Sequence, residues 1–302
     1  MIYTVTLVPA LDLILHLHDN CRIGVVNRAY EEHPLSGGKG INVSRVLKTL
    51  KRESVALGFV GGFSGKTLED ELHCAGIKTD FAQISNFTRV NVKIVVDGED
   101  TTEINAPSPA LSKEDIMGLV KKIAKIKKDD VVVISGAMPK SFPLPLFDDC
   151  IKLLENNKTN MVIDMSGTPL LKTLRYKPFL VKINQRELAD TLYLSVNNDD
   201  DIVRGAKRLL KMGAQNVVIT RGKNGAIFVN KSMVMNLKCP KGEVKNTSGA
   251  GDSFLAGFID EYLISESFEK ALKKGIIVGS ASAFSIDLPD EKTIKEVAKL
   301  VK

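Results

Sequence analysis

From residue 112 onward the sequence alternates short, wholly apolar segments with amphipathic ones, and this alternation most strongly limits the possible folds. Strands that are buried on both faces belong to parallel sheets covered by helices, because each crossover places a helix on the sheet. The pattern therefore predicts an α/β fold of three layers, with a mostly parallel central sheet and helices on both faces. The clearest predicted strands span residues 130–135, 160–165, 179–184 and 216–220.

Two other regions interrupt this pattern, and their residues alternate between apolar and polar with a period of two. Such alternation is typical of antiparallel strands that expose one face to solvent. The two regions lie near residues 12–34 and 87–106. We therefore expect one domain over residues 1–302, with a small β-sheet lid built from these two discontinuous segments.

The composition is that of an ordinary globular protein, with 44% apolar and 26% charged residues among 302. Its apolar runs are far shorter than the ~20 residues of a membrane helix, and no signal peptide is visible, so we expect a cytoplasmic protein with no membrane partner. Four cysteines without CxxC spacing favour reduced thiols. The net charge of +6 suits anionic small molecules, whereas the lack of Trp and of aromatics between basic residues argues against nucleic acid.

The segment NTSGAGDSFLAGF, residues 246–258, places one acid directly behind three small residues at the start of a predicted helix. Unsatisfied N–H groups at a helix N-terminus attract anions, and phosphates above all. Asp252 has two interpretations there: it caps the helix, or it accepts a proton from a group that attacks a bound phosphate. With an unperturbed pKa of about 4 it would be ionised at neutral pH. This stretch alone leaves both interpretations open.

Further polar residues follow the predicted strands, at the edge where open α/β sheets bind their ligands. Each one alone is a candidate cap or turn residue, but together they predict a site. They are Asp12, Ser135, Asp164, Asn184, Glu187 and Thr220–Gly222. The segment SGGKGINVSRVL, residues 36–47, adds paired glycines that let the backbone approach a ligand and a lysine that supplies charge.

Three other patterns fail on spacing or on partners. The stretch GGFSGKT, residues 61–67, is not a Walker loop because Val60 stands where the first glycine belongs. A dinucleotide fingerprint would require glycine at Phe254. His16 and His18 share a strand face, but without further ligands nearby we interpret them as part of a solvated lid edge.

GGKGINVS at residues 37–44 and the segment around Asp252 resemble, in spacing and order, the two signature segments of the ribokinase-like PfkB carbohydrate kinases. The similarity covers essentially the whole chain and is greatest to 1-phosphofructokinases and tagatose-6-phosphate kinases. It implies a ribokinase-like fold, ATP and Mg²⁺ as cofactors, and a ketohexose monophosphate as acceptor, either tagatose-6-phosphate or fructose-1-phosphate. The chain departs from the usual family residues at Val8, Ser108, Lys140, Ile183 and Asn246.

The resemblance also implies roles for individual residues. Asp252 would be the catalytic base, and the amides of Gly249, Ala250 and Gly251 would form the anion hole. Asn184 and Glu187 match the NxxE motif, through which the family holds its metal ion. The positions that match nucleotide-binding residues are Lys182, Asn184, Thr220, Gly222, Gly225 and Gly279.

On the acceptor side, Arg89 and Arg28 would hold the sugar phosphate, because guanidinium groups pair with phosphate through two hydrogen bonds. A plain salt-bridge role stays open for both. Glu103 stands where fructose-6-phosphate kinases of the family tend to carry a second arginine, so we expect it to accept sugar hydroxyls and to repel a phosphate. The remaining positions that match acceptor-binding residues are Asp12, Gly38, Lys39, Asn42 and Ser135.

Two alternatives to this function are a kinase for another sugar or a nucleoside, and a catalytically silent sugar-phosphate sensor on the same fold. The presence of Asp252, Asn184 and Glu187 argues against the sensor. One face of the lid is expected to cover the sugar, and the other to pair with a second subunit in a homodimer.

Overall fold

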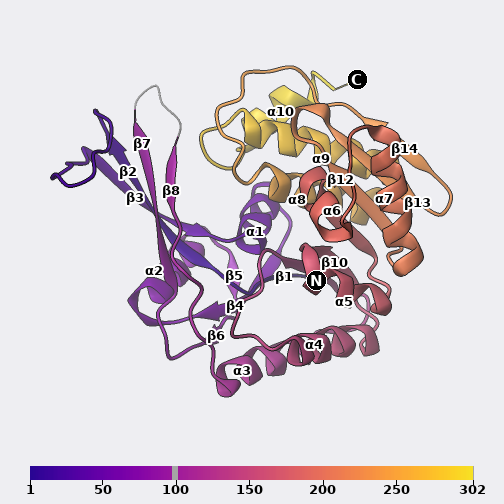
Figure 1. Cartoon of the computed structure of the whole chain (residues 1–302), viewed down its shortest axis with the longest axis horizontal. Coiled ribbons are helices and arrows are strands. Elements are labelled where there is room, and N and C mark those ends of the chain that lie inside the picture. Colours follow the sequence, from indigo (N-terminus) through magenta and orange to yellow (C-terminus); the bar gives the residue numbers. More distant parts are fainter. Residues whose placement is uncertain (97–100, 302) are drawn as a thin grey trace.

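The computed structural model of the chain describes residues 1–96 and 101–301. A large sheet with helices on both faces forms the body, and a separate four-stranded sheet stands at one side of it (Figure 1). The expected α/β architecture with a small separate sheet is confirmed. Residues 97–100 of the predicted lid segment lie outside the described residues.

The N-terminal strand β1 lies inside the large sheet, between β9 and β4. Along the sheet from β5 at one side to β12, every pair of neighbouring strands is parallel, whereas β13 pairs antiparallel with both β12 and β14. The strand order is β14 (Val234–Leu237), β13 (Ala226–Asn230), β12 (Asn216–Thr220), β11 (Leu180–Asn184), β10 (Asn160–Asp164), β9 (Val131–Ser135), β1 (Ile2–Thr6), β4 (Ser54–Val60) and β5 (Lys78–Thr79), with β6 (Ala82–Gln83) also paired to β4.

Helices cover both faces of this sheet because successive side chains of each strand point to opposite sides. In β9, Val132 belongs to the core cluster that contains side chains of α3 to α7, and Val133 belongs to the cluster that contains side chains of α1, α8, α9 and α10. No helix in the described ranges is long and apolar enough to cross a membrane. The helices are α1 (Lys39–Thr49), α2 (Gly62–Cys74), α3 (Lys113–Ile123), α4 (Leu144–Asn156), α5 (Gly167–Thr173), α6 (Gln185–Leu192), α7 (Asp199–Met212), α8 (Ala250–Ser265), α9 (Phe268–Ala283) and α10 (Glu291–Ala298).

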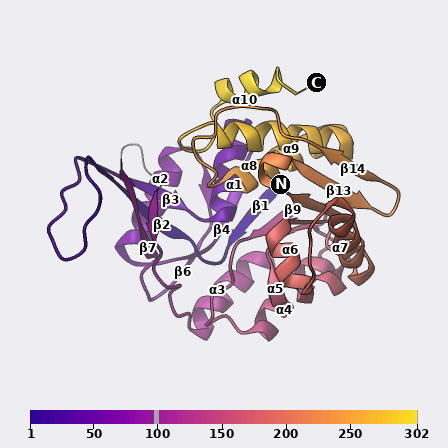
Figure 2. The ribbon, with the colours of Figure 1, turned by 45° about the horizontal axis from the view of Figure 1, so that its top comes forward.

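The lid is a sheet of four strands in the order β3 (Glu31–Gly37), β2 (Ala10–Leu17), β7 (Arg89–Val96) and β8 (Thr102–Ile104). The strands β2 and β3 are antiparallel, as expected for the first region, and so are β7 and β8, whereas β2 and β7 pair in parallel and join the two regions. The strand expected over residues 25–33 begins only at Glu31. Residues 18–30 form an exposed loop that extends away from the rest of the molecule (Figure 2).

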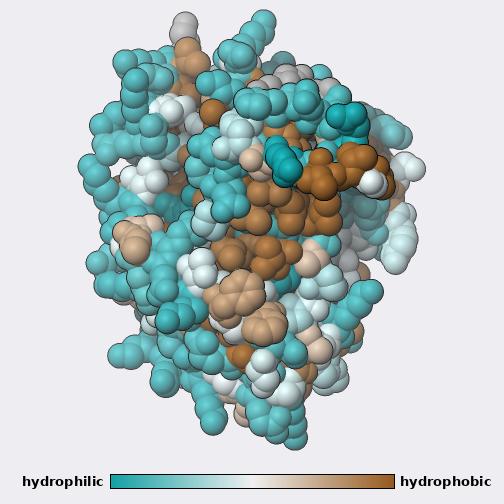
Figure 3. All heavy atoms as spheres, turned by 90° about the vertical axis from the view of Figure 1, so that its left-hand side faces the viewer, coloured by the Kyte–Doolittle hydropathy of each residue, from teal (hydrophilic) through white to brown (hydrophobic). Residues whose placement is uncertain are grey.

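The two faces of the lid differ in character. Asp12, Asn91 and Lys93 lie on the face that is turned toward the body. The opposite face carries a row of cross-strand apolar neighbours, Leu13, Val92 and Ile104, and the Ile104 side chain is 57% exposed. Apolar side chains gather on the side of the molecule that carries the lid (Figure 3). The lid therefore has one polar face and one apolar face, as its alternating sequence predicts.

Candidate active site

A cavity of about 1130 Å³ lies between the lid and the carboxyl ends of the central strands. Its walls come from segments far apart in the sequence, which meet because parallel strands end at the same edge of a sheet. Seventeen of the nineteen predicted site residues line it, all except Arg28 and Glu187. They are Asp12, Gly38, Lys39, Asn42, Arg89, Glu103, Ser135, Lys182, Asn184, Thr220, Gly222, Gly225, Gly249, Ala250, Gly251, Asp252 and Gly279.

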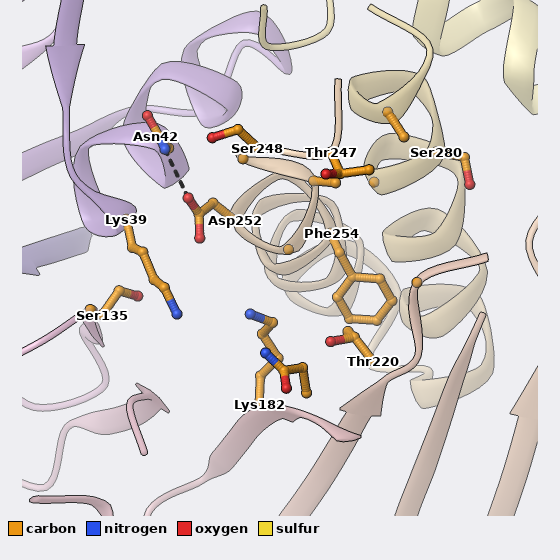
Figure 4. Close-up of a pocket in the computed structure, with 18 of the residues that line it drawn as sticks. Lys39, Asn42, Ser135, Lys182, Thr220, Thr247, Ser248, Asp252, Phe254 and Ser280 are labelled. Carbon is orange, nitrogen blue, oxygen red and sulfur yellow. Dashed lines mark hydrogen bonds between the residues drawn. The ribbon is translucent and has the colours of Figure 1, made fainter. Parts of the chain in front are cut away.

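Asp252 lies in the first turn of α8 and is buried. Asn42 Nδ2 donates a hydrogen bond of 2.8 Å to its Oδ2 (Figure 4). Gly249 precedes the helix with a φ of 75°, in the left-handed region, and a Cβ there would lie 2.7 Å from Leu288. The glycine is therefore required by the turn that presents the helix N-terminus to the cavity.

Burial, and after it the nearby Asp164 carboxylate, raise the pKa of Asp252 to about 6. Lys182, the hydrogen bond from Asn42 and Lys39 act in the opposite direction. The pKa is thus higher than the ordinary value assumed from sequence. A carboxylate with this pKa is largely ionised at neutral pH and still accepts a proton readily, as a general base requires.

Two lysines extend into the space beside Asp252 (Figure 4). Lys182 Nζ donates to Asp164 Oδ1 at 2.9 Å, and both side chains are almost completely buried. Lys39 Nζ lies 3.9 Å from the same oxygen and 3.4 Å from Glu187 Oε1. The Asp164 carboxylate, followed by Glu187 and Asp252, raises the pKa of Lys39 against the opposing effect of burial. The Lys39 ammonium group therefore stays charged and available to an anionic ligand.

Asn184 and Glu187 form a capping box at the start of α6. Asn184 Oδ1 accepts from the Glu187 N–H at 2.8 Å, and Glu187 Oε2 accepts from the Asn184 N–H at 3.0 Å. Glu187 lies outside the main cavity and lines an adjoining one that also contains Lys39. The motif therefore has a structural role in α6 whether or not it also holds a metal ion.

Asp164 was marked in the sequence only as a carboxylate at the end of a buried strand, and it is the last residue of β10. Its Oδ1 pairs with Lys182, and its Oδ2 is buried without a hydrogen-bond partner. An orphaned buried carboxylate oxygen costs free energy unless a ligand or cation meets it. Together with the oxygens of Asn184 and Glu187, it provides the hard donors that Mg²⁺ prefers.

The lid supplies the other end of the cavity. Asp12 accepts from Asn91 Nδ2 at 2.8 Å and pairs with Lys93 Nζ at 2.9 Å, so its carboxylate is fixed from two sides. Arg89 Nη1 donates to the Ala106 carbonyl at 3.2 Å, while its buried Nε has no partner. Desolvation lowers the pKa of Arg89, and Asp12 opposes this shift. Lys93 was not among the site residues assigned from the sequence.

The far end of the cavity is narrow and apolar. A Cβ on Gly225 would lie 1.9 Å from the Leu237 carbonyl oxygen, so this position requires glycine. A Cβ on Gly279 would lie 3.0 Å from the Ala250 carbonyl oxygen, which is a tight contact. Apolar side chains that sequence analysis did not assign complete this end, because no motif marks them. They include Val244, Phe254, Ile276, Ala283 and Phe284.

Arg28 does not lie in the cavity. It belongs to the exposed loop of residues 18–30, because β3 begins later than its alternating sequence suggests. Within this chain the structure therefore does not bring Arg28 beside Arg89.

The cavity joins a helix N-terminus, a buried acid and two lysines, and comparison with known proteins agrees with its chemistry. A model of the pfkB family carbohydrate kinases matches residues 6–288. The chain belongs to this family. Membership makes it a phosphotransferase with an alcohol group as acceptor, as the resemblance implied.

Relatives of this PfkB-family chain match it from end to end. It is 36% identical to a 1-phosphofructokinase of Bacillus subtilis (strain 168) over 302 residues, which is 100% of this chain and 99% of that protein. It is 34% identical to a D-tagatose-1-phosphate kinase of Bacillus licheniformis, over 100% of this chain and 98% of that protein. The solved structure of Escherichia coli phosphofructokinase-2 in complex with substrates and products superposes with a TM-score of 0.94 at 25% identity, over 99% of both chains. The ribokinase-like fold is thereby confirmed.

Proposed function

We propose that the chain transfers the γ-phosphate of ATP to a terminal hydroxyl of a ketohexose monophosphate, giving the bisphosphate. The observation that carries this proposal is the position of Asp252. It lies on the wall of one continuous cavity, between the basic lid end and the glycine-rich apolar end. The acceptor hydroxyl and the donor phosphate would meet beside this carboxylate.

The residues around Asp252 have distinct roles in the proposed reaction. Asp252 accepts the proton of the acceptor hydroxyl, which increases its nucleophilicity. The amides of Gly249, Ala250 and Gly251 face charge that develops on the transferring group, at the positive end of α8. Lys39 and Lys182 stabilise the same negative charge, because phosphoryl transfer depends mainly on positioning and electrostatics.

We further propose that Asp164, Asn184 and Glu187 hold Mg²⁺. Their oxygens form a hard donor set, and the unpartnered Asp164 Oδ2 supports a cation beside it. The ion would neutralise phosphate charge in the bound nucleotide. Lys39 would then balance whatever negative charge the cation leaves, since it already contacts both Asp164 and Glu187.

The lid end of the cavity supports an acceptor that already carries a phosphate. Arg89 has a buried Nε that lacks a partner, and Lys93 adds a second cation on the same lid face. The relatives from the two Bacillus species are named for ketohexose 1-phosphates. Glu103 lies directly opposite Lys93 across the β7–β8 pair and would accept sugar hydroxyls at the cavity rim.

The experiment is a coupled ADP-release assay with fructose-1-phosphate, tagatose-1-phosphate, tagatose-6-phosphate, fructose-6-phosphate and unphosphorylated fructose. We expect the highest kcat/KM for one of the first three compounds. A preference for free fructose or for a nucleoside would contradict the phosphosugar assignment. ADP release that stays at the acceptor-free level throughout would instead support the sensor.

We also propose that the chain forms a homodimer through the apolar face of the lid. Leu13, Val92 and Ile104 form a row of cross-strand apolar neighbours there, and a partly exposed row on a small sheet favours pairing with a second copy. Light scattering should give twice the chain mass, and Ile104→Asp should shift it to the monomer. A monomer of wild type at all workable concentrations would contradict this arrangement.

A further inference from the structure

Three of the chain's four histidines lie on or beside the lid, and two of them meet a carboxylate there. One ligand atom from each of His16, Glu31 and His33 lies within 4.8 Å of the others. Among the residues that the structure describes, no other group of three or more His, Cys, Asp or Glu side chains converges in this way. The sequence suggested no partners for His16, because both come from the neighbouring strand.

The strand register explains why these side chains converge. His16 of β2 is the direct cross-strand partner of Glu31 in β3, so both side chains project from the same face. His33 follows Glu31 by two residues and therefore shares that face as well. Its Nε2 already lies 3.0 Å from Glu31 Oε1. The backbone of the hairpin thus places all three side chains on one face of the lid.

We propose that His16, Glu31 and His33 bind a divalent transition-metal ion of the zinc type. Two imidazoles and one carboxylate are a common donor set of zinc sites with three protein ligands, which keep a fourth position for water. Zinc bonds of about 2.0–2.2 Å require the donor atoms to move slightly closer together. The His33 and Glu31 side chains are 55% and 52% exposed, so they are free to rotate and the ion has access from solvent.

The site is distinct from the catalytic cavity. His16 follows Asp12 by four residues on the same face of β2, a separation of roughly 13 Å at about 3.3 Å per residue. Its nitrogen donors also favour zinc over Mg²⁺, which prefers oxygen ligands. The two metals therefore do not compete for the same groups. An ion bound here would link the end of β2 to the start of β3, beside the loop of residues 18–30, and would stabilise the hairpin.

The test is a zinc titration by isothermal calorimetry of tag-free protein in excess Mg²⁺. We expect one zinc ion per chain, and an affinity at least about tenfold weaker in each of His16→Ala, Glu31→Gln and His33→Ala. Zinc should also raise the melting temperature of wild type and leave that of the three variants nearly unchanged, because a ligand stabilises only the state that binds it.

His18→Ala and His73→Ala are the matched controls. The His18 ring stacks on Tyr30 with centroids 4.1 Å apart, and His73 contacts Thr79, so neither belongs to the three-residue group. Both variants should bind zinc like wild type. The proposal is overturned if wild type binds no zinc under these conditions, or if His16→Ala and His33→Ala bind it as tightly as wild type. The second result would locate the zinc elsewhere, for example at the cavity carboxylates.

Discussion

The amide of Asn42 donates a hydrogen bond of 2.8 Å to the carboxylate of Asp252, and so joins the N-terminal turns of two helices whose residues lie 210 positions apart. This bond occupies one carboxylate oxygen, and the other points into the cavity (Figure 4). The two glycine-rich segments therefore act as one unit, in which α1 orients the acid that α8 carries.

Asp252→Asn should lower kcat by about a hundredfold or more, the scale of a lost general base, while nucleotide affinity stays nearly unchanged. The amide keeps the size of the side chain and cannot accept the proton. Steady-state kinetics and a nucleotide-binding titration measure the two effects separately. A variant with most of its activity would contradict the role of Asp252 as base.

Asp260→Asn is the matched control for this substitution. Asp260 is also buried in α8, but it does not line the cavity. Its Oδ1 accepts a hydrogen bond of 2.8 Å from Arg52 Nε. Loss of this ion pair should lower the melting temperature and leave kcat within a few-fold of wild type. A large fall in kcat here would mean that any buried charge in α8 affects turnover.

The activity should fall as pH drops through about 6, the pKa to which burial and Asp164 raise Asp252. Below this pH the carboxyl group is protonated, so kcat/KM should decrease by about tenfold per pH unit. Asn42→Ala removes a hydrogen bond that lowers this pKa, and the acid limb should move to higher pH. A pH profile with the same limb in both proteins would rule out Asn42 as a determinant of this pKa.

The same raised pKa makes a prediction about stability. The folded carboxyl binds a proton more tightly than the unfolded one, whose value is 3.8, so stability should rise as pH falls from about 6 toward 4. At pH 8 the buried charge is unfavourable, and Asp252→Asn should raise the free energy of unfolding by up to about 3 kcal/mol. Denaturant unfolding at pH 8 and pH 4.5 measures this, and the gain should be smaller at the lower pH.

Glu187→Gln should weaken the response to Mg²⁺ about tenfold, because the carboxylate charge is lost. The amide oxygen still accepts from the Asn184 N–H, so α6 keeps its cap. Asp115→Asn changes the equivalent position in the Ser112 capping box of α3, far from the cavity, and is the control. An unchanged magnesium titration for Glu187→Gln would remove Glu187 from the metal site.

Arg89→Ala should raise KM for phosphorylated acceptors by about tenfold or more, and affect unphosphorylated fructose much less, because a charge-assisted hydrogen bond contributes about 1.5–3 kcal/mol. Arg175→Ala, at an exposed arginine that contacts Asp148, is the control. Parallel kinetics with both acceptor types give the comparison. Equal losses for both would exclude a phosphate anchor at Arg89.

Much of the fold could be predicted because strands such as Val131–Ser135 are buried on both faces and therefore appear as continuous apolar runs. The candidate site could be located for a related reason. Parallel strands end at one edge of the sheet, so Ser135, Asn184 and Thr220 had to converge there once the strands were identified.

What the sequence could not provide are distances between elements. The alternating neighbours of Arg28 suggest a strand, and only the pairing of β2 with Glu31–Gly37 fixes where β3 begins and leaves Arg28 in the loop. The pKa of Asp252 depends on burial and on Asp164, which comes from another strand. The partners of His16 were hidden for the same reason, since cross-strand register is a property of the folded hairpin.

The position of β1 between β9 and β4 has a consequence for synthesis on the ribosome. The first strand made cannot be flanked on both sides until Val131–Ser135 has left the ribosome, and Asn42 must wait for Asp252. At 5–20 residues per second, those 210 positions take about 10–40 s. Throughout this interval the nascent chain contains the residues of the acceptor side of the pocket but lacks Asp252. A truncated product would therefore bind a sugar at most and would not phosphorylate it.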